Sequence, residues 1–384
     1  MNGYITRGAL FLLLLNGCGS STIVYTEART EQPDREQRPP ADVRPTTVPT
    51  RACELELVDL TVEHVDDAWL NGVSLAVDGD GELHVAYAVG TDLRYARRAD
   101  GVWWIDAEAP VQESGEAPSL AIDVFGRRHV SYYRSNFSGS TGPGVLRYVV
   151  AEQSLWSDFE TVEPNGSLKS GLFNDIVVTA GGDVHVVYYQ LHTKKLRHAW
   201  RDAAGWSTET IASEGGRLSL AIDTADALHV AYTSQNRLHY ATKPVNGAWS
   251  DTVVLDSDDD VERPQIAVGP DSVHIAFTHD PTGQDELFHA WRAKGSWNVE
   301  AAGLPHGRNP QITVEEGRVH VVAQSYGGLT YAVRTSNGWH HFPLDTSEPA
   351  GLRSSILWHD QMIHVLYAAN GTLRYARFSP SCGG

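Results

Sequence analysis

Short apolar runs recur along most of this chain, each bounded by turn-forming residues, and the clearest copy lies between Ser219 and Trp249. It holds the runs Ser-Leu-Ala-Ile-Asp (219–223), Leu-His-Val-Ala-Tyr (228–232) and Leu-His-Tyr-Ala (238–241), followed by Gly-Ala-Trp (247–249) and a fourth apolar run. Short runs of β-branched and aromatic residues, separated by Asp, Asn and Gly, are typical of strands joined by tight turns. The pattern therefore predicts a four-stranded antiparallel meander.

This unit occurs seven times. A histidine followed by Val or Ile marks the second run of each copy, at spacings of 44 to 56 residues: His84, His129, His185, His229, His274, His320 and His364. The first run recurs in the stretches that begin at Ser74, Ser119, Asp175, Gln265, Gln311 and Ser355. A period near 45 residues with four strands per copy is typical of a β-propeller, in which blades pack radially. We predict an all-β, seven-bladed β-propeller with four antiparallel strands per blade.

The fourth strand indicates how the ring closes. It begins with a tryptophan in six copies, at Trp104, Trp156, Trp206, Trp249, Trp297 and Trp339, but the chain ends soon after the third strand of the seventh copy. Residues 55–65 read as a strand with no blade ahead of it. We predict that this N-terminal strand completes the last blade, which would bring Cys53 beside Cys382. In an oxidising compartment we expect a disulfide between them.

The N-terminal residues predict export. The apolar run 9–15 is too short to span a bilayer as a lasting helix, and its ending Leu15-Asn16-Gly17-Cys18 resembles the lipobox of bacterial lipoproteins. That resemblance implies a lipid on Cys18, and Gly19 in place of Asp favours the outer membrane; the alternative is an ordinary signal peptide with an incidental cysteine.

Composition then divides the rest of the chain. Residues 19–52 are rich in Pro and mixed charges and poor in large apolar residues, which is typical of a disordered tether. The predicted domains are thus a signal peptide (1–18), a tether (19–52) and the propeller (53–384). The net charge of −18 argues against nucleic acid or an anionic membrane surface as a partner. We expect a monomer that contacts the membrane through its lipid anchor only.

The repeated histidines and tryptophans are expected to be structural. A residue repeated in every blade cannot converge with its copies on one ion, so we predict no metal site there and expect each His to hydrogen-bond the backbone or the turn Asp of its own blade. The tryptophans are expected to wedge between blades, with a sugar-stacking platform as the alternative. We predict no cofactor. Calcium at Asp78 and Asp80, or at the acidic run Asp256, Asp258, Asp259 and Asp260, is the alternative, because clustered carboxylates suit hard cations.

A candidate binding site lies where the blades differ. Arg217, Arg263 and Arg353 stand two residues before the first-strand run, and Arg308 is displaced by one position in the blade between the last two. Loops that enter the first strand ring the mouth of the channel, on what we call the top face, so four arginines would line one side of it. Guanidinium groups suit carboxylate or phosphate. Glu116 and Asn174 belong to the opposite arc. The alternative is that each arginine pairs with a loop acid such as Glu262 or Glu348.

Two resemblances accompany these residues. The arginines are similar in kind to those of sialidases, which hold a substrate carboxylate, although the Ser-x-Asp-x-Gly-x-x-Trp boxes of sialidases are missing from this sequence. The pieces Leu-x-His-Ala-Trp and Gly-Trp-Ser (196–200, 205–207 and 287–291) resemble those of tectonin-type lectin propellers. Both likenesses concern short motifs and imply the fold more than an activity.

The leading hypothesis is a membrane-anchored extracytoplasmic binding or scaffolding propeller, whose ligand is a glycan or an envelope protein at the top-face channel mouth. The alternative is a glycan-active hydrolase or lyase that uses the arginines. An enzyme needs a positioned acid and base. Glu116, Asp280 and Asp285 lie in suitable loops, but no pairing is enforced by the sequence, so no catalytic residue is assigned.

Overall fold

The computed structural model describes residues 55–67, 69–90, 92–106, 115–135, 144–153, 155–163, 169–202, 204–315, 317–347 and 349–382. The chain separates into two units, Met1–Ala52 and Cys53–Gly384, and the described residues all belong to the second. The predicted signal peptide, the tether, Cys18 and Cys53 therefore lie outside the described residues. None of the described segments forms a helix that could span a bilayer.

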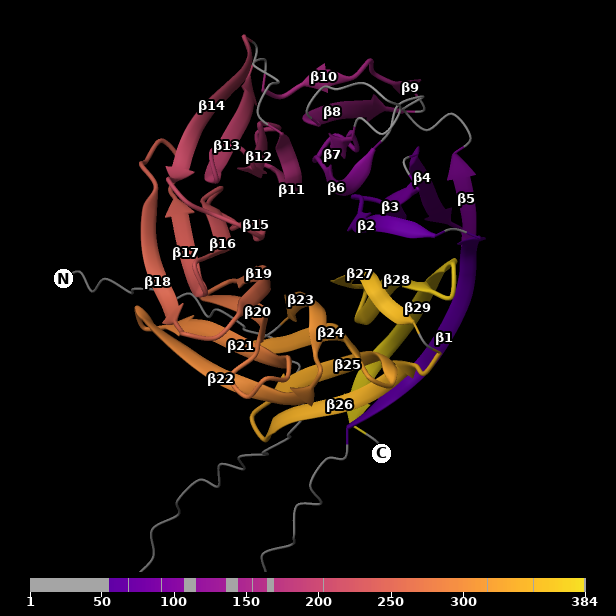
Figure 1. Cartoon of the computed structure of the whole chain (residues 1–384). Helices are drawn as coiled ribbons and strands as arrows, with labels where there is room; N and C mark the ends of the chain where they lie inside the picture. The colour runs from indigo at the N-terminus through magenta and orange to yellow at the C-terminus, as the bar shows by residue number, and fades with distance from the viewer. Residues whose placement is uncertain are drawn as a thin grey trace, which may run out of the picture. The chain divides into compact units, whose positions relative to one another are not determined.

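The described chain forms seven antiparallel sheets that follow one another around a ring, which confirms the predicted seven-bladed β-propeller (Figure 1). The innermost strands of blades 1 to 7 are β2 (Leu70–Val77), β6 (Glu116–Ile122), β11 (Ser170–Val178), β15 (Leu218–Ile222), β19 (Val261–Gly269), β23 (Arg308–Glu315) and β27 (Ala350–His359). The second strands are β3 (Leu83–Val89), β7 (Arg128–Arg134), β12 (Val184–Gln190), β16 (Leu228–Ser234), β20 (Ser272–His279), β24 (Arg318–Ser325) and β28 (Met362–Ala369).

The third strands are β4 (Asp92–Ala99), β8 (Val145–Glu152), β13 (Lys195–Asp202), β17 (Arg237–Lys243), β21 (Glu286–Ala293), β25 (Gly328–Thr335) and β29 (Thr372–Cys382). The outer strands are β5 (Val102–Asp106), β14 (Gly205–Ala212), β18 (Ser250–Asp256), β22 (Ser296–Pro305), β26 (Gly338–Asp345) and β1 (Leu55–Asp67). In blade 2 the outer strand is split into β9 (Leu155–Trp156) and β10 (Glu160–Thr161), both paired with β8.

The N-terminal strand closes the ring as predicted. β1 pairs antiparallel with β29, in a register that sets Val62 opposite Ala376 and Leu55 opposite Cys382. In Figure 1, β1 runs along the outside of the blade formed by β27, β28 and β29. Because Cys53 lies outside the described residues, its pairing with Cys382 stays a prediction.

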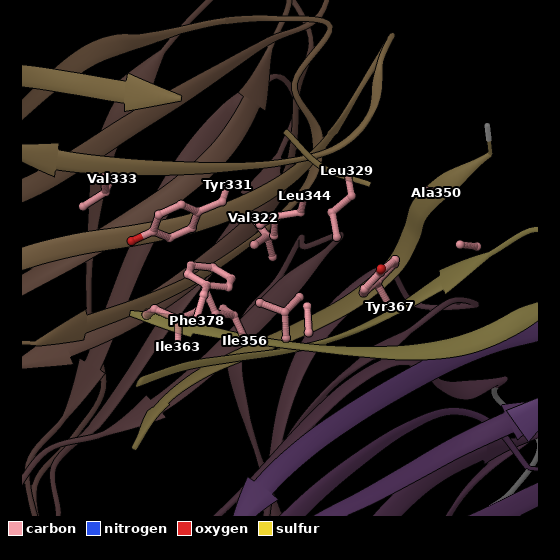
Figure 2. Packing of buried hydrophobic residues seen from close by; sticks show 13 residues of the cluster. Val322, Leu329, Tyr331, Val333, Leu344, Ala350, Ile356, Ile363, Tyr367 and Phe378 are labelled. Carbon is pink, nitrogen blue, oxygen red and sulfur yellow. The ribbon is translucent and has the colours of Figure 1, made fainter. Parts of the chain in front are cut away.

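Apolar side chains from neighbouring blades interlock to form the core. Between blades 6 and 7, Tyr331 and Val322 pack with Ile356, Tyr367 and Phe378, which are all buried (Figure 2). The rings of Tyr331 and Phe378 meet edge to face with centroids 4.8 Å apart, a geometry favoured by the aromatic quadrupole. Both faces of each blade are therefore covered, which explains why the strands read as almost continuous apolar runs.

The inner strands are also joined by a ring of hydrogen bonds from one blade to the next. The side chain at the same position of each inner strand accepts the backbone N–H of the following blade in five cases: Ser74 from Leu120, Ser119 from Ile176, Asp175 from Leu220, Ser219 from Ile266 and Ser355 from Leu75. The last of these joins blade 7 to blade 1. The first-strand run of the sequence thus encodes the contacts that hold the channel wall together.

Four of the seven repeated histidines contact the turn Asp or the backbone of their own blade, as predicted, whereas His185, His274 and His320 contact other side chains. His129 Nε2 lies 3.2 Å from Asp123 Oδ2 in the turn of its own blade, and its Nδ1 lies 2.6 Å from the hydroxyl of Tyr148. His84 and His229 make the same contacts with Asp78 and Tyr95, and with Asp223 and Tyr240. Burial lowers the pKa of His129, so the neutral imidazole is the form that these contacts hold.

One of the predicted tryptophan wedges is wrong. Trp156, Trp206 and Trp297 each meet the tyrosine of the preceding blade edge-on, as expected. In blade 1, however, Trp104 is 58% exposed, and its neighbour Trp103 packs against Tyr375. Because side chains alternate between the two faces of a strand, only one of two adjacent tryptophans can face the preceding blade.

Candidate functional site

The top-face mouth of the channel is built by a repeated irregularity at the start of the inner strands. Pairing with the second strand is interrupted there, and in three blades the interruption has the same form. Ala117, Arg263 and Asn309 have positive φ angles of 47°, 54° and 50° and are each followed by proline. Proline has no N–H to donate to a strand ladder, so the chain bulges at this point. The bulge presents the residue before proline at the mouth.

These positions line a cavity of about 370 Å³, which we call the mouth cavity. All seven blades contribute the equivalent residue, in order Gly72, Ala117, Phe173, Arg217, Arg263, Asn309 and Arg353. Uncharged residues, Gly72, Ala117 and Phe173, therefore form one arc, and the three arginines lie with Asn309 in the other. This is the polarised mouth that the sequence predicted, with one change.

The change concerns Arg308, which does not line the mouth cavity. The residue of blade 6 that reaches the mouth is Asn309, and Arg308, one position earlier, forms an ion pair with Asp285. Arg308 instead lines a separate cavity of about 270 Å³ together with His306 and Tyr326. The displacement by one residue visible in the sequence is decisive, because neighbouring residues of an extended chain point in different directions. The fourth arginine of the predicted set is therefore misplaced.

The three remaining arginines differ in how they are held. Arg217 stacks over the ring of Phe173, with its guanidinium carbon 4.6 Å from the ring centroid. Arg353 Nη1 donates to the carbonyl of Leu352 at 3.1 Å. Arg263 Nη1 donates to Asn309 Oδ1 at 2.7 Å, and its Nε lies 3.4 Å from Glu262 Oε2. Of these three arginines, only Arg263 has a carboxylate partner among the described residues. Glu348, the other loop acid of the alternative, lies outside the described residues, so its pairing with an arginine of the mouth stays untested.

The arginines also repel one another. Burial lowers the pKa of Arg217, and the nearby charges of Arg263 and Arg353 lower it further, whereas Glu262 opposes this effect. Burial and Arg263 likewise lower the pKa of Arg353. Arginine remains charged at neutral pH, so the mouth cavity concentrates positive charge that a bound anion would relieve.

The two predicted residues of the opposite arc, Glu116 and Asn174, line the mouth cavity, but they differ in how many hydrogen bonds they already make within the protein. Glu116 lines the cavity and accepts a hydrogen bond of 2.5 Å from Ser135 Oγ. Asn174 also lines it, but its Nδ2 donates to the carbonyls of Ala117 and Gly171, both at 3.0 Å, and its Oδ1 accepts from Ser131 at 2.6 Å. The Asn174 amide therefore holds the loops of blades 2 and 3 and has little capacity left for a ligand.

The mouth cavity continues outward over blade 4. An adjoining hollow of about 290 Å³ shares Phe173 and Arg217 with it and adds Tyr189, Asn236 and Asp260. The rings of Phe173 and Tyr189 are stacked with centroids 6.1 Å apart. We call this hollow the side groove. It offers an aromatic wall beside a cluster of guanidinium groups.

Two further side chains of the second strands are unavailable to a ligand, and one residue of the mouth was missed by the sequence analysis. Tyr232 is buried against His239, and buried His279 contacts the carbonyl of Asp260 at 3.1 Å. Asn309 was missed, although the Pro that follows it, which recurs at the same place in two other blades, could have indicated that this residue and not Arg308 faces the mouth.

The calcium alternatives stay predictions, and Asp78 and Asp256 already have partners within the protein. Asp78 Oδ1 accepts the backbone N–H groups of Asp80 and Glu82, and its Oδ2 contacts His84, as in a self-contained turn. Asp78, Glu82 and His84 lie close enough to share an ion, but the other oxygen of Asp78 is already engaged. In the second candidate run, Asp256 is paired with Arg237 at 2.7 Å.

Comparisons with known proteins define a fold and no family. No family model matches the chain, and no curated protein matches it. Solved structures do match. Virginiamycin B lyase from Staphylococcus aureus is 12% identical with a TM-score of 0.58, over 85% of this chain and 100% of the other. The polysaccharide lyase Uly1 is 11% identical with a TM-score of 0.53, over 82% and 90%. The microbial sialidase Hz136 is 11% identical with a TM-score of 0.49, over 81% and 65%. The chain is thus similar in fold to the two lyases, and this likeness shows the fold alone.

Proposed function

We propose that this protein is an envelope-anchored binding propeller and that its mouth cavity holds a glycan bearing carboxylate groups. One observation carries the proposal: Arg217, Arg263 and Arg353 from three blades line a single cavity with one carboxylate partner among the described residues. A planar carboxylate matches the fork of a guanidinium group. Binding it would replace the mutual repulsion of the arginines with charge-assisted hydrogen bonds.

The side groove supports a sugar as the bearer of the carboxylate. Phe173 and Tyr189 form an aromatic wall directly beside Arg217. A pyranose ring has an apolar face that packs on aromatic rings, while amide and carboxylate groups such as those of Asn236 and Asp260 suit its hydroxyls. An acidic unit over the arginines and a neighbouring unit in the side groove would together fill both hollows.

Binding is favoured over hydrolysis. A glycosidase needs a pair of carboxylates set across the scissile bond, and Glu116 is the sole carboxylate among the described residues that line the mouth cavity. The side groove adds Asp260 and Glu262, but Glu262 is paired with Arg263. Asp280 and Asp285, the other candidate acids, do not line the mouth cavity, and Asp285 is held by Arg308. No catalytic residue can be transferred to this chain from the enzymes of similar fold, since the sequence identity is 11 to 12%.

The anchoring part of the proposal comes from the N-terminal residues. A lipid on Cys18 and a tether over residues 19–52 would hold the propeller at the outer membrane and leave its top face accessible. Labelling of the wild-type protein with a radioactive fatty acid, lost in Cys18→Ser, tests this part separately. Retention of the label in Cys18→Ser would contradict it.

The ligand is tested by isothermal titration calorimetry with uronic-acid oligosaccharides and with the same oligosaccharides reduced to neutral sugars. We expect binding of the acidic series alone, weakened at least about tenfold in Arg353→Gln and in Arg217→Gln. Arg308→Gln is the matched control, because it removes an arginine of the same face that lies outside the mouth cavity. Equal binding of the neutral series would overturn the proposal. Cleavage of the oligosaccharides, abolished in Arg353→Gln, would establish the enzyme alternative.

A further inference from the structure

A second cavity lies between blades 3 and 4, at the end of the propeller opposite the mouth. It measures about 520 Å³ and is lined by the turns between the first and second strands and between the third and fourth strands. Those turns lie at the other end of the strands from the loops of the mouth, since antiparallel strands alternate in direction. We call it the blade 3–4 cavity. His185, Trp200, Asp183, Asp226 and Lys243 contribute to its wall.

A chain of hydrogen bonds ends at this cavity. Glu209 Oε1 lies 2.9 Å from His198 Nδ1, and His198 Nε2 lies 3.0 Å from His185 Nδ1. Glu209 also accepts from Lys243 Nζ and Trp249 Nε1, both at 2.9 Å. Burial raises the pKa of Glu209, but the hydrogen bonds from these three partners outweigh burial and lower it to about 2. Glu209 is therefore a carboxylate at neutral pH and can only accept.

The ionised Glu209 fixes the proton positions along the chain. Because Glu209 accepts, His198 must carry its proton on Nδ1. Burial lowers the pKa of His198 to about 4, so the ring is neutral and its Nε2 is an acceptor. His185 must then donate through Nδ1. Burial lowers the pKa of His185 as well, so its Nε2 carries a lone pair and no proton.

The equivalent nitrogen has a partner in five of the other six blades and lacks one among the described residues in blade 6, where His320 Nε2 is buried. In blades 1, 2 and 4 the equivalent Nε2 contacts the turn aspartate. In blade 5, the same histidine pair occurs, but His274 Nε2 is capped by Ser272 Oγ at 2.9 Å. In blade 7, His364 Nε2 contacts the carbonyl of His359 at 3.2 Å.

In blade 3 the turn residue is Thr179, whose hydroxyl accepts from the backbone N–H of Asp183. His185 Nε2 makes no hydrogen bond within the described part of the chain. His185 differs from His320 because it is partly exposed and lines the blade 3–4 cavity.

The remaining wall of the cavity is also rich in acceptors. Asp183, Asp202 and Asp226 line it and have no basic partner among the described residues. The two basic side chains of the wall are already neutralised, since Lys243 is bound by Glu209 and Arg201 by Glu160 at 2.8 Å. Trp200 adds an indole that stacks on His198, with ring centroids 5.4 Å apart. Carboxylates, an unprotonated imidazole and an indole together suit a cation that carries N–H donors.

We propose that the blade 3–4 cavity binds an organic cation, a primary ammonium or guanidinium group, with Asp183 and Asp226 as counter-ions and His185 Nε2 as a hydrogen-bond acceptor. This site is independent of the acidic ligand proposed for the mouth. Its charge preference is the opposite one, so the two sites bind groups of opposite sign at opposite ends of the propeller. The ligand is either a small amine or a basic side chain of a protein.

The first test determines the tautomers of His185 and His198 by nuclear magnetic resonance. Long-range proton–nitrogen correlation spectra at pH 7 are expected to show His185 and His198 protonated on Nδ1 and free on Nε2, with His185→Gln providing the assignment. A proton on His185 Nε2 would overturn the acceptor role. The blade 5 histidines His274 and His289 serve as the internal comparison, and we expect the same tautomers for them.

The second test measures binding by calorimetry, with agmatine, an amidated arginine-containing peptide and methyl glucoside as probes. We expect agmatine and the peptide to bind and methyl glucoside not to bind. Tighter binding of agmatine assigns the site to small amines, and tighter binding of the peptide assigns it to protein side chains. Asp183→Asn and Asp226→Asn are each expected to weaken binding about tenfold or more.

Asp271→Asn is the matched control, since it removes an exposed carboxylate from the equivalent turn of blade 5. Unchanged affinity in Asp183→Asn and Asp226→Asn, or binding of methyl glucoside in place of agmatine, would overturn the proposal. Circular dichroism of each variant establishes that the propeller is intact. Failure at this cavity leaves the oligosaccharide titration at the mouth unaffected, so the two proposals are distinguishable.

Discussion

Trp206 Nε1 donates a hydrogen bond of 2.8 Å to Glu160 Oε2 and so joins the outer strand of blade 3 to that of blade 2. The same contact recurs from Trp156 to Asp106, from Trp249 to Glu209 and from Trp339 to Glu300. These four tryptophans therefore act as more than apolar wedges, because each of them connects its blade to a carboxylate of the preceding blade at the circumference.

Trp206→Phe is expected to lower the free energy of unfolding by about 1 to 3 kcal/mol, because the hydrogen bond to a carboxylate is lost while an aromatic ring still faces Tyr148. Urea denaturation followed by circular dichroism measures the change. Trp104→Phe is the control, since Trp104 is 58% exposed. Equal losses in the two variants would contradict this role for the indole N–H.

Asp175 occupies a position of the inner strands that is serine in four other blades. It accepts from Leu220 N at 2.8 Å and from Ser119 Oγ at 2.6 Å, so it contacts the blades on both sides. Asp175→Ala leaves the Leu220 N–H without its partner and is expected to cost about 1 to 3 kcal/mol.

Asp175→Ser restores the residue that the other blades use and is expected to cost less than Asp175→Ala in the same urea experiment. If both variants unfold at the same urea concentration, the inter-blade hydrogen bond contributes nothing to stability.

The buried histidines predict a loss of stability in mild acid. Burial lowers the pKa of His198, His274 and His364 to about 4 and that of His289 and His320 to about 3, from 6.5. Below pH 6.5 these histidines become protonated in the unfolded chain but stay neutral in the folded protein. The contribution of these histidines to the free energy of unfolding is therefore complete above pH 6.5 and falls steadily towards pH 4. For one histidine the loss is roughly 1.4 kcal/mol for each unit by which its folded pKa lies below its unfolded pKa.

Urea midpoints measured from pH 7.5 to pH 4 test this dependence. Asp175 acts in the opposite direction: burial raises its pKa, so its contribution grows as the pH falls. We expect the histidines to dominate because there are more of them. His320→Gln should flatten the curve, whereas His192→Gln, an exposed position, should not. A wild-type midpoint that does not change over this range would refute the prediction.

The closing strand predicts an effect of oxidation. If Cys53 and Cys382 form a disulfide, reduction or Cys53→Ser removes a cross-link that closes a very long loop, at a cost of up to about 5 kcal/mol in the entropic model. Melting under oxidising and reducing conditions measures the difference, with Cys18→Ser as the control. A melting temperature that is the same in both conditions would show that pairing of β1 with β29 suffices to close the ring.

Most of the fold could be predicted from local sequence patterns. The position of each inner and second strand could be predicted, because each blade is formed by one continuous stretch of chain. The apolar runs and the turn residues of a blade therefore follow one another in the sequence. Closure by residues 55–65 could also be predicted, since a propeller leaves no open edge. The sequence could not decide whether Trp103 or Trp104 packs between the blades, because that depends on which face of β5 meets Tyr375.

The sequence by itself determined seven repeated blades, an N-terminal strand that completes the last of them, and an arginine at the channel end of the inner strands of blades 4, 5 and 7. The tertiary structure alone decided that Arg308 pairs with Asp285, and that His185 Nε2 has no hydrogen-bond partner among the described residues. The physical reason is that periodicity fixes the face of a strand on which a residue lies. The direction of a side chain at a bulge, and the atom that completes a hydrogen-bond chain, depend on neighbours from other blades.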